Sequence, residues 1–254
     1  MKISVVVPMC NEAANIERTL RSIQRAAEVA DIDHQIIVVD NGSDDGGREI
    51  AEGQGARVVL STGISVAALR NLGAELSDGE YLAFVDADME MPEEWLQIWI
   101  DCLRTGRADL LAIVHVPPPV APWCARIWGH RILAQRATES LHDYLPSTNF
   151  CMLRSSFEEV GGFDVALRSG EDKDFTLRLH AAGYRLLSLP SPAAIHWGYE
   201  RGFGEWMRKE FWRQSSLAAL LAKGGFRRLR LLRFPLIALG HWVADMLAVA
   251  AMLA

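Results

Sequence analysis

The chain has 254 residues, of which 50% are hydrophobic and 23% are charged. This composition excludes a disordered chain, a collagen-like chain and a disulfide-stapled miniprotein, and the length is sufficient to bury a large core. The formal net charge of −6 argues against nucleic acid as a partner. The charge is unevenly divided: residues 1–199 carry 17 basic and 28 acidic side chains, whereas residues 200–254 carry 9 and 4. An acidic body with a basic tail is typical of a protein that meets a membrane surface.

The first 115 residues alternate β-branched runs with amphipathic stretches. The runs predict strands at Ile3–Val7, Gln35–Val39, Arg57–Leu60, Tyr81–Val85 and Ala108–Val114. The stretches between them predict helices over Asn15–Glu28, up to Gln54, over Val66–Leu76 and over Pro92–Leu103. Such alternation predicts an α/β fold, with a mostly parallel central sheet covered by helices. In sheets of this kind, ligands bind beyond the carboxyl ends of the strands.

The pattern changes at Pro117–Pro119. A basic, tryptophan-bearing stretch follows and is predicted to be helical to about His142. The segment Ser147–Trp197 mixes short strands with one helix near Asp172–Ala182, and the rest of the chain predicts two helices broken at Gly224–Gly225.

Acidic residues stand where strands are predicted to stop. Asp40 follows the second strand, Asp86 and Asp88 follow the fourth, and Asp172 with Glu171 follows a glycine-bearing loop. A single Asp after a strand is commonly only a turn residue. The Asp86-Ala87-Asp88 pair suits a hard cation such as Mg²⁺ or Mn²⁺, although a capped turn into the next helix explains it equally well.

The sequence lacks the motifs of several other enzyme classes. The chain contains no GxxxxGK[ST] phosphate loop, no GxGxxG after its first strand and no GxSxG elbow. His115, His130, His142 and His180 lack metal-site spacing and are expected to be ordinary histidines. The four cysteines (Cys10, Cys102, Cys124 and Cys151) form no CxxC pair, and the first residues show no secretory signal, so we expect a reducing, cytoplasmic location.

Five motifs in order resemble those of the family-2 glycosyltransferases, which have the nucleotide-diphospho-sugar transferase (GT-A) fold. They are VVVPMCNE (5–12), VVDNGSDDG (38–46), LRNLGAELSDGEYLAFVDADMEMP (69–92), GGFD (161–164) and GEDKDF (170–175). The resemblance covers about residues 3–200. It implies a catalytic domain over 1–200, with a nucleotide-sugar-binding half (1–115) and an acceptor-binding half (116–200), followed by a tail over 201–254.

The resemblance implies a donor site for a UDP- or GDP-linked sugar. Pro8, Asn11 and Glu12 match the first-strand motif that lines the nucleoside pocket. Asp40 matches an acid that bonds the base or ribose, and Arg70 matches a basic residue near the pyrophosphate.

The resemblance also implies a divalent cation, Mn²⁺ or Mg²⁺, on the diphosphate. Asp86 and Asp88 match the DxD pair, in which the second Asp typically holds the metal. His196 matches a late histidine that many proteins of this fold supply to the metal, and the alternative is an ordinary histidine beside Trp197. Arg213 lies where some relatives place a basic residue over the diphosphate.

Asp172 matches the proposed general base of inverting members, and Glu171 would help to position it or the acceptor. The chemistry agrees, because an acceptor hydroxyl is a weak nucleophile and a carboxylate can take its proton during attack. The QxxRW motif of processive synthases is absent, which favours transfer of a single sugar. A retaining transferase on the same fold, and a non-catalytic nucleotide-sugar-binding protein, remain alternatives.

The tail predicts where the reaction takes place. Phe234–Ala254 is a predominantly apolar segment of 21 residues, interrupted by His241 and Asp245. Four arginines precede it: Arg227, Arg228, Arg230 and Arg233. We expect a membrane-associated helix on the inner face of the cytoplasmic membrane. The alternative is a helix buried against a partner subunit, which would make a homo-oligomer.

The tryptophan-bearing stretch could add a second interfacial patch, or it could pack in the core. Its apolar residues are Trp123, Ile127, Trp128, Ile132 and Leu133. Together with the tail, this stretch favours a lipid-linked or membrane-near acceptor, as in cell-envelope or polysaccharide glycan synthesis.

Overall fold

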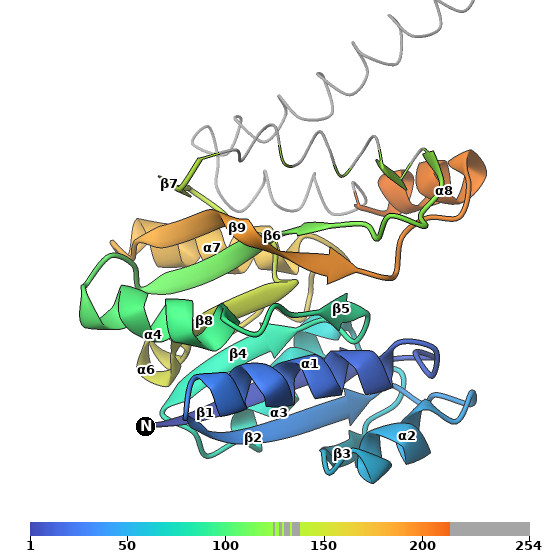
Figure 1. Ribbon diagram of the computed structural model, residues 1–254, viewed down its shortest axis with the longest axis horizontal. Helices are drawn as coiled ribbons and strands as arrows, with labels where there is room; N and C mark the ends of the chain where they lie inside the picture. Colours follow the sequence, from blue (N-terminus) through green and yellow to red (C-terminus); the bar gives the residue numbers. More distant parts are fainter. Residues whose placement is uncertain (124, 127–128, 130–132, 134–137, 214–254) are drawn as a thin grey trace, which may run out of the picture.

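The computed structural model describes residues 1–213, apart from residues 124, 127–128, 130–132 and 134–137. Within these residues nine strands form one sheet, and helices cover both of its faces (Figure 1). The strand order is β3-β2-β1-β4-β8-β6-β9-β5, and β7 pairs with β9 off this path. The predicted α/β fold is confirmed.

The elements follow the predicted order closely. The strands are β1 (Lys2–Met9), β2 (Asp33–Asp40), β3 (Arg57–Leu60), β4 (Tyr81–Val85), β5 (Met89–Glu90), β6 (Leu110–Val116), β7 (Ser140–Leu141), β8 (Asn149–Leu153) and β9 (Leu186–His196). The helices are α1 (Ile16–Val29), α2 (Gly47–Gly53), α3 (Val66–Glu75), α4 (Trp95–Arg104), α6 (Arg154–Glu159), α7 (Glu171–Ala181) and α8 (Phe203–Arg213). Each helix and strand predicted in the first 115 residues is present, with ends that shift by up to three residues.

The sheet is parallel in its first half and mixed in its second. Strands β3, β2, β1 and β4 all run in one direction. Strand β8 then runs antiparallel to both β4 and β6, whereas β6 and β9 are parallel to each other. Because β1, β2 and β4 are parallel, their carboxyl ends meet at one edge of the sheet.

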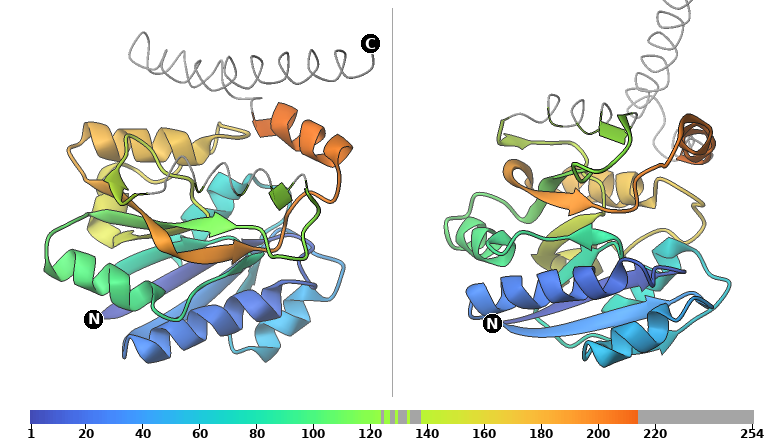
Figure 2. Two further views of the ribbon diagram at one scale, coloured as in Figure 1. Left: turned by 45° about the horizontal axis from the view of Figure 1, so that its top comes forward. Right: turned by 45° about the vertical axis from the view of Figure 1, so that its right-hand side comes forward.

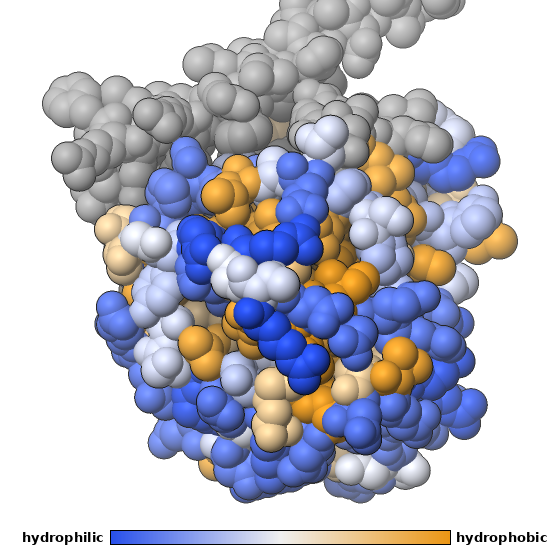
Figure 3. All heavy atoms as spheres, turned by 60° about the vertical axis from the view of Figure 1, so that its left-hand side comes forward, coloured by the Kyte–Doolittle hydropathy of each residue, from blue (hydrophilic) through white to orange (hydrophobic). Residues whose placement is uncertain are grey.

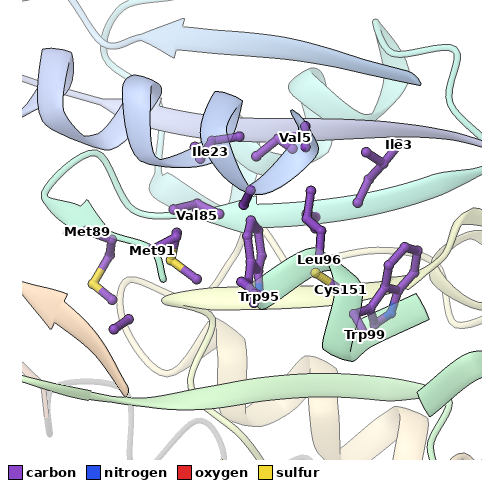
Figure 4. Close-up of a cluster of buried hydrophobic side chains, with 14 of the residues drawn as sticks. Ile3, Val5, Ile23, Val85, Met89, Met91, Trp95, Leu96, Trp99 and Cys151 are labelled. Atoms are coloured by element: carbon purple, nitrogen blue, oxygen red, sulfur yellow. The ribbon is translucent and has the colours of Figure 1, made fainter. Parts of the chain in front are cut away.

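The buried parts of β1, β2 and β4 are mostly apolar because both faces of the sheet are covered. Val5 and Val7 of β1 pack in a cluster with α1 and α4, whereas Val6 between them packs in a second cluster with α3, α6 and α7. Figure 2 shows these two layers of helices around the sheet. In the first cluster, Trp95 and Ile23 point into the space between α4, α1 and the sheet (Figure 4).

The predicted helix between residues 123 and 142 is too long. Ser140 and Leu141 form β7, which pairs antiparallel with Ser188 and Leu187 of β9, so the chain is extended before His142. The pairing partner lies more than 40 residues later, beyond the reach of local periodicity. The predicted break at Gly224–Gly225, the apolar segment Phe234–Ala254 and the arginines before it lie outside the described residues.

The molecular surface beside α4 and α6 is mostly hydrophilic, and hydrophobic residues appear there singly or in small groups (Figure 3). None of the helices in the described part of the chain has the length and hydropathy needed to cross a membrane. The predicted site residues follow the strands β1, β2 and β4, at one edge of the sheet.

Candidate active site

Most of the predicted residues gather at the carboxyl edge of the parallel strands. Asn11 and Glu12 follow β1, Asp40 ends β2, and Asp86 and Asp88 follow β4. Two elements from late in the chain reach the same edge, because α7 begins at Glu171 and β9 ends at His196 beside β5 (Figure 1). The sequence-based prediction that these acids converge on one edge agrees with this arrangement.

Arg70 of α3 lies at the centre of this edge and is 3% exposed. Its Nη2 donates to Oδ1 of Asp86 at 2.8 Å, and its Nη1 donates to Oε1 of Glu171 at 2.8 Å. The guanidinium also lies 5.4 Å from the centre of the Phe163 ring. Arg70 therefore bridges two of the predicted site acids, whereas the sequence placed it near the pyrophosphate.

The two acids that Arg70 contacts have perturbed pKa values. Burial raises the pKa of Asp86, and the charge of Arg70 only partly opposes this effect. Burial likewise raises the pKa of Glu171, and the adjacent charge of Asp172 adds to it. Carboxyls with such environments are typical of functional sites, although structural ion pairs produce similar shifts.

Asp88 and His196 form a pair beside this bridge. Oδ2 of Asp88 lies 3.2 Å from Nε2 of His196, and the backbone N–H of Trp197 donates to the carbonyl of Asp88 at 2.8 Å. The pair depends on the register of β5 and β9, in which Met89 stands opposite His196. Gly198 lies so close that a Cβ there would be 1.8 Å from Oδ2 of Asp88.

Asp88 and His196 each stabilise the charged form of the other. Burial lowers the pKa of His196, but the hydrogen bond and charge of Asp88 outweigh it, so that the net pKa is raised. Burial raises the pKa of Asp88, but His196 outweighs this effect and the net pKa is lowered. Burial also raises the pKa of Glu12, and the charge of Asp88 contributes to this shift, which places Glu12 within electrostatic reach of the pair.

The pair fits one side of a divalent metal site. A carboxylate oxygen and an imidazole nitrogen are both common ligands of divalent cations, and those of Asp88 and His196 lie 3.2 Å apart. Across the described residues, no group of three or more His, Cys, Asp or Glu side chains could hold an ion. A cation that also binds phosphate oxygens and water needs only one or two protein ligands, so the donor set suits a cation that arrives with a diphosphate.

The carboxylate of Asp40 is hydrogen-bonded within the segment that follows β2. Its side chain has no exposed surface and accepts hydrogen bonds from the N–H and Oγ of Ser43 and from the guanidinium of Arg48. Burial raises the pKa of Asp40, but these bonds outweigh it and the net pKa is lowered. In this arrangement the carboxylate holds the loop after β2, and the contact with the base or ribose of the donor that the family resemblance implies stays a prediction.

The loops after β1 and β2 are joined to each other. The backbone N–H of Asn11 donates to Oγ of Ser43 at 2.8 Å, and Oδ1 of Asn11 accepts from the N–H of Asp44 at 3.0 Å. Asn11 has a φ of 57°, in the left-handed region that Asn tolerates better than most residues. Pro8 is buried in β1 opposite Val39 of β2. Pro8 and Asn11, which are predicted to line the nucleoside pocket, are therefore held against β2 and the loop that follows it.

Asp172 lies in the first turn of α7, one residue after Glu171. Oδ1 of Asp172 accepts from the N–H of Lys173 at 2.7 Å, and the side chain is partly exposed. Glu171 is 6% exposed and faces Arg70. Consecutive residues of a helix point in different directions, so Glu171 faces the protein interior while Asp172 stays partly exposed.

Two residues near the pair were not among the predicted site residues. His115 of β6, which was expected to be an ordinary histidine, has its ring 5.3 Å from that of His196. Nζ of Lys209 in α8 donates to the carbonyl of Gly198 at 3.2 Å. Only the register of β6 with β9 and the course of the chain into α8 bring these residues here. Arg213 ends α8, and its side chain lies outside the described part of the structure.

The profile of the family described as "Glycosyl transferase family 2" matches residues 4–161, which is more than half of the chain. The chain therefore belongs to glycosyl transferase family 2, a family of enzymes.

Two proteins to which the chain is similar are transferases by name. Glycosyltransferase AglE of Haloferax volcanii is 29% identical over 218 residues, covering 82% of this chain and 70% of AglE. Undecaprenyl-phosphate 4-deoxy-4-formamido-L-arabinose transferase of Pseudomonas aeruginosa is 28% identical over 164 residues, covering 60% of this chain and 46% of that protein. The chain thus spans less than half the length of this second relative.

Among solved structures, the fold is similar to that of the mannosyltransferase PcManGT from Pyrobaculum calidifontis, whose structure is in complex with GDP-Man and Mn²⁺. The TM-score is 0.66 at 21% sequence identity, over 87% of this chain and 63% of PcManGT. At this identity the similarity establishes the fold alone.

Proposed function

We propose that the protein transfers a sugar from a UDP- or GDP-linked donor to an acceptor hydroxyl, with inversion at the anomeric carbon and the help of Mn²⁺ or Mg²⁺. The observation that carries the proposal is the Asp88–His196 pair at the carboxyl edge of the sheet, 3.2 Å apart. It lies in the same site as Asp172, because Arg70 bridges Asp86 to Glu171. The GDP-Man and Mn²⁺ of the PcManGT complex support the donor class and the cation.

The donor would lie along the edge with its diphosphate at the metal. Asp88 and His196 would hold the cation, with Asp86 beside them, while Pro8, Asn11 and Glu12 line the nucleoside end. When bound, a divalent cation would neutralise the charge that develops on the departing nucleoside diphosphate. Arg213, at the end of α8, would add positive charge over the diphosphate.

Asp172 would act as the general base. Its carboxylate is partly exposed and stands at the start of α7. In that position it would accept the proton of the acceptor hydroxyl while the oxygen attacks the anomeric carbon. Attack from the side opposite the leaving group inverts the anomeric centre. Glu171, held by Arg70, would keep the first turn of α7 in place.

The acceptor is proposed to be lipid-linked or near a membrane, in cell-envelope or polysaccharide glycan synthesis. The undecaprenyl-phosphate named for the Pseudomonas relative supports this proposal. Trp123 is 65% exposed and Phe211 of α8 is 74% exposed, as expected for residues that meet a bilayer interface. We propose residues 1–200 as the catalytic domain and 201–254 as the tail that holds it at the inner face of the cytoplasmic membrane.

The test is a donor screen scored by release of the nucleoside diphosphate. UDP-glucose, UDP-GlcNAc and GDP-mannose are supplied with Mn²⁺ and a panel of lipid-linked and soluble acceptors. We expect release with one donor, its loss after chelation, and a product whose anomeric configuration by NMR is opposite to that of the donor. Asp172→Asn should lower kcat about 10²–10⁴-fold, whereas Asp33→Asn, an exposed residue at the start of β2, should not.

Three outcomes would contradict parts of the proposal. Retention of configuration would indicate a retaining transferase on the same fold. Full activity of Asp172→Asn would show that Asp172 is not the general base. Binding of nucleoside diphosphates without turnover of any donor would favour a non-catalytic nucleotide-sugar-binding protein.

A further inference from the structure

Helix α3 joins the loop after β4 to the segment that leads into α7. Asn71 donates from Nδ2 to the carbonyl of Phe163 at 2.8 Å and accepts from the N–H of Phe163 at 2.9 Å. Gly162 packs so tightly here that a Cβ would lie 2.9 Å from Oδ1 of Asn71. The preceding residue, Arg70, makes the ion pairs with Asp86 and Glu171. Two consecutive residues of α3 thus fix a segment that lies about 90–100 positions later in the chain.

Both terminal nitrogens of Arg70 are directed at carboxylates of the protein. Each of its two terminal nitrogens contacts one carboxylate at 2.8 Å, and its side chain is 4% exposed. Its Nε is buried and has no hydrogen-bond acceptor among the described residues. The Phe163 ring closes one face of the guanidinium. The side chain is therefore enclosed by protein and oriented by two acids from different parts of the chain.

We propose that Arg70 is a positioning residue that couples the loop after β4 to the start of α7, and so sets the placement of Asp172 relative to the diphosphate end of the donor. The proposal rests on the function proposed above for Asp86, Asp88 and Asp172. It changes the role of Arg70 from donor contact to a bridge between the donor side and the base side of the site.

The chemistry of arginine explains why this bridge needs that residue. The planar guanidinium presents two terminal nitrogens in a fixed fork, so that one side chain can hold two carboxylates in a defined mutual orientation. A lysine at this position keeps the positive charge but has a single ammonium group on a flexible stem. A small displacement of a catalytic group from its productive geometry can cost about 100-fold in rate.

The kinetic test compares Arg70→Lys, Glu171→Gln and the double variant with the wild type. Because Arg70 acts on catalysis through Glu171, we expect Arg70→Lys to lower kcat about 100-fold with KM for the donor unchanged. The double variant should be no slower than Arg70→Lys alone, since residues that act as a unit are not additive. Arg154→Lys is the matched control. It removes a partly buried arginine with three hydrogen bonds, to Gly79, Ala74 and Ser77, away from the site.

A second measurement needs no turnover. Hydrogen exchange should increase at least about tenfold in Arg70→Lys at two separate segments, residues 86–89 and 171–175, while amides of β1 keep their protection. Arg154→Lys should change neither segment.

The outcomes separate this inference from the proposed function. If the wild type turns over no donor, the function fails, but the paired change in exchange still decides whether the bridge exists. A rise in KM or in the Kd for UDP or GDP with unchanged kcat would make Arg70 a donor contact and overturn the inference. Additive effects of the two substitutions, or a change in exchange at only one segment, would overturn it as well.

Discussion

Substituting Gly198 by Ala tests the geometry of the Asp88–His196 pair directly. The new Cβ would lie 1.8 Å from Oδ2 of Asp88, 2.8 Å from its Cγ and 3.2 Å from Nε2 of His196, whereas real Cβ contacts essentially never fall under 3.0 Å. The carboxylate therefore has to move by at least about 1.2 Å, the difference between these two distances. Metal ligands tolerate displacements of only about 0.2 Å. Asp88 is a short side chain held by His196, so it cannot absorb this movement without leaving its partner.

We expect Gly198→Ala to weaken binding of Mn²⁺ in the presence of UDP or GDP about 100-fold, equivalent to about 2.7 kcal/mol. Isothermal titration calorimetry on the folded variant measures this change. Gly202→Ala is the matched control, because a Cβ at Gly202 meets no atom within 4 Å. If folded Gly198→Ala binds Mn²⁺ within twofold of the wild type, Asp88 does not hold the metal from the position described here.

Two further substitutions test residues that stabilise the elements around the site. Asp40→Asn should lower the free energy of unfolding by about 2 kcal/mol at neutral pH, because the buried carboxylate accepts bonds from Ser43 and Arg48. The folded-state pKa of Asp40 is below 3.8, so this contribution is present above that pH and is lost as the pH falls through the folded-state pKa. Urea unfolding at several pH values should show the two proteins converging in acid, and a difference independent of pH would refute the assignment. Gly73→Ala should cost about 1–3 kcal/mol, because a Cβ would lie 2.3 Å from Cγ1 of Val6. Adding Val6→Ala should recover part of this loss, and a wild-type midpoint for Gly73→Ala alone would contradict the packing.

The local pattern of the chain was enough to predict the first half of the fold. Runs such as Ile3–Val7 and Tyr81–Val85 lie between two layers of helices and are largely apolar, with Ser4 as the polar exception, so they are easily identified. The second half was harder to predict. Strand β7 has only two residues and exists because it pairs with β9, so the sequence around Ser140 carries no periodic signal of its own.

The site, like the fold, could be predicted from the sequence only in part. The acids at strand ends were identified because turn chemistry and strand termination depend on residues close in sequence. The residues that contact these acids could not be identified from the sequence. Asp40, for example, is enclosed between Ser43 and Arg48. Nothing in the spacing of the sequence indicated that Arg48 would turn back toward the end of β2.

The sequence by itself therefore determined where the acids after β2 and β4 and at the start of α7 stand in the fold, because those positions follow from local strand and helix signals. Only the tertiary structure decided which groups meet. Asp88 pairs with His196 across 108 positions, and Arg70 reaches Glu171 across 101. These contacts depend on the register of β9 against β5 and on the packing of α3 against the start of α7. Such long-range pairings arise from burial and hydrogen bonding in the folded chain, which residue spacing does not encode.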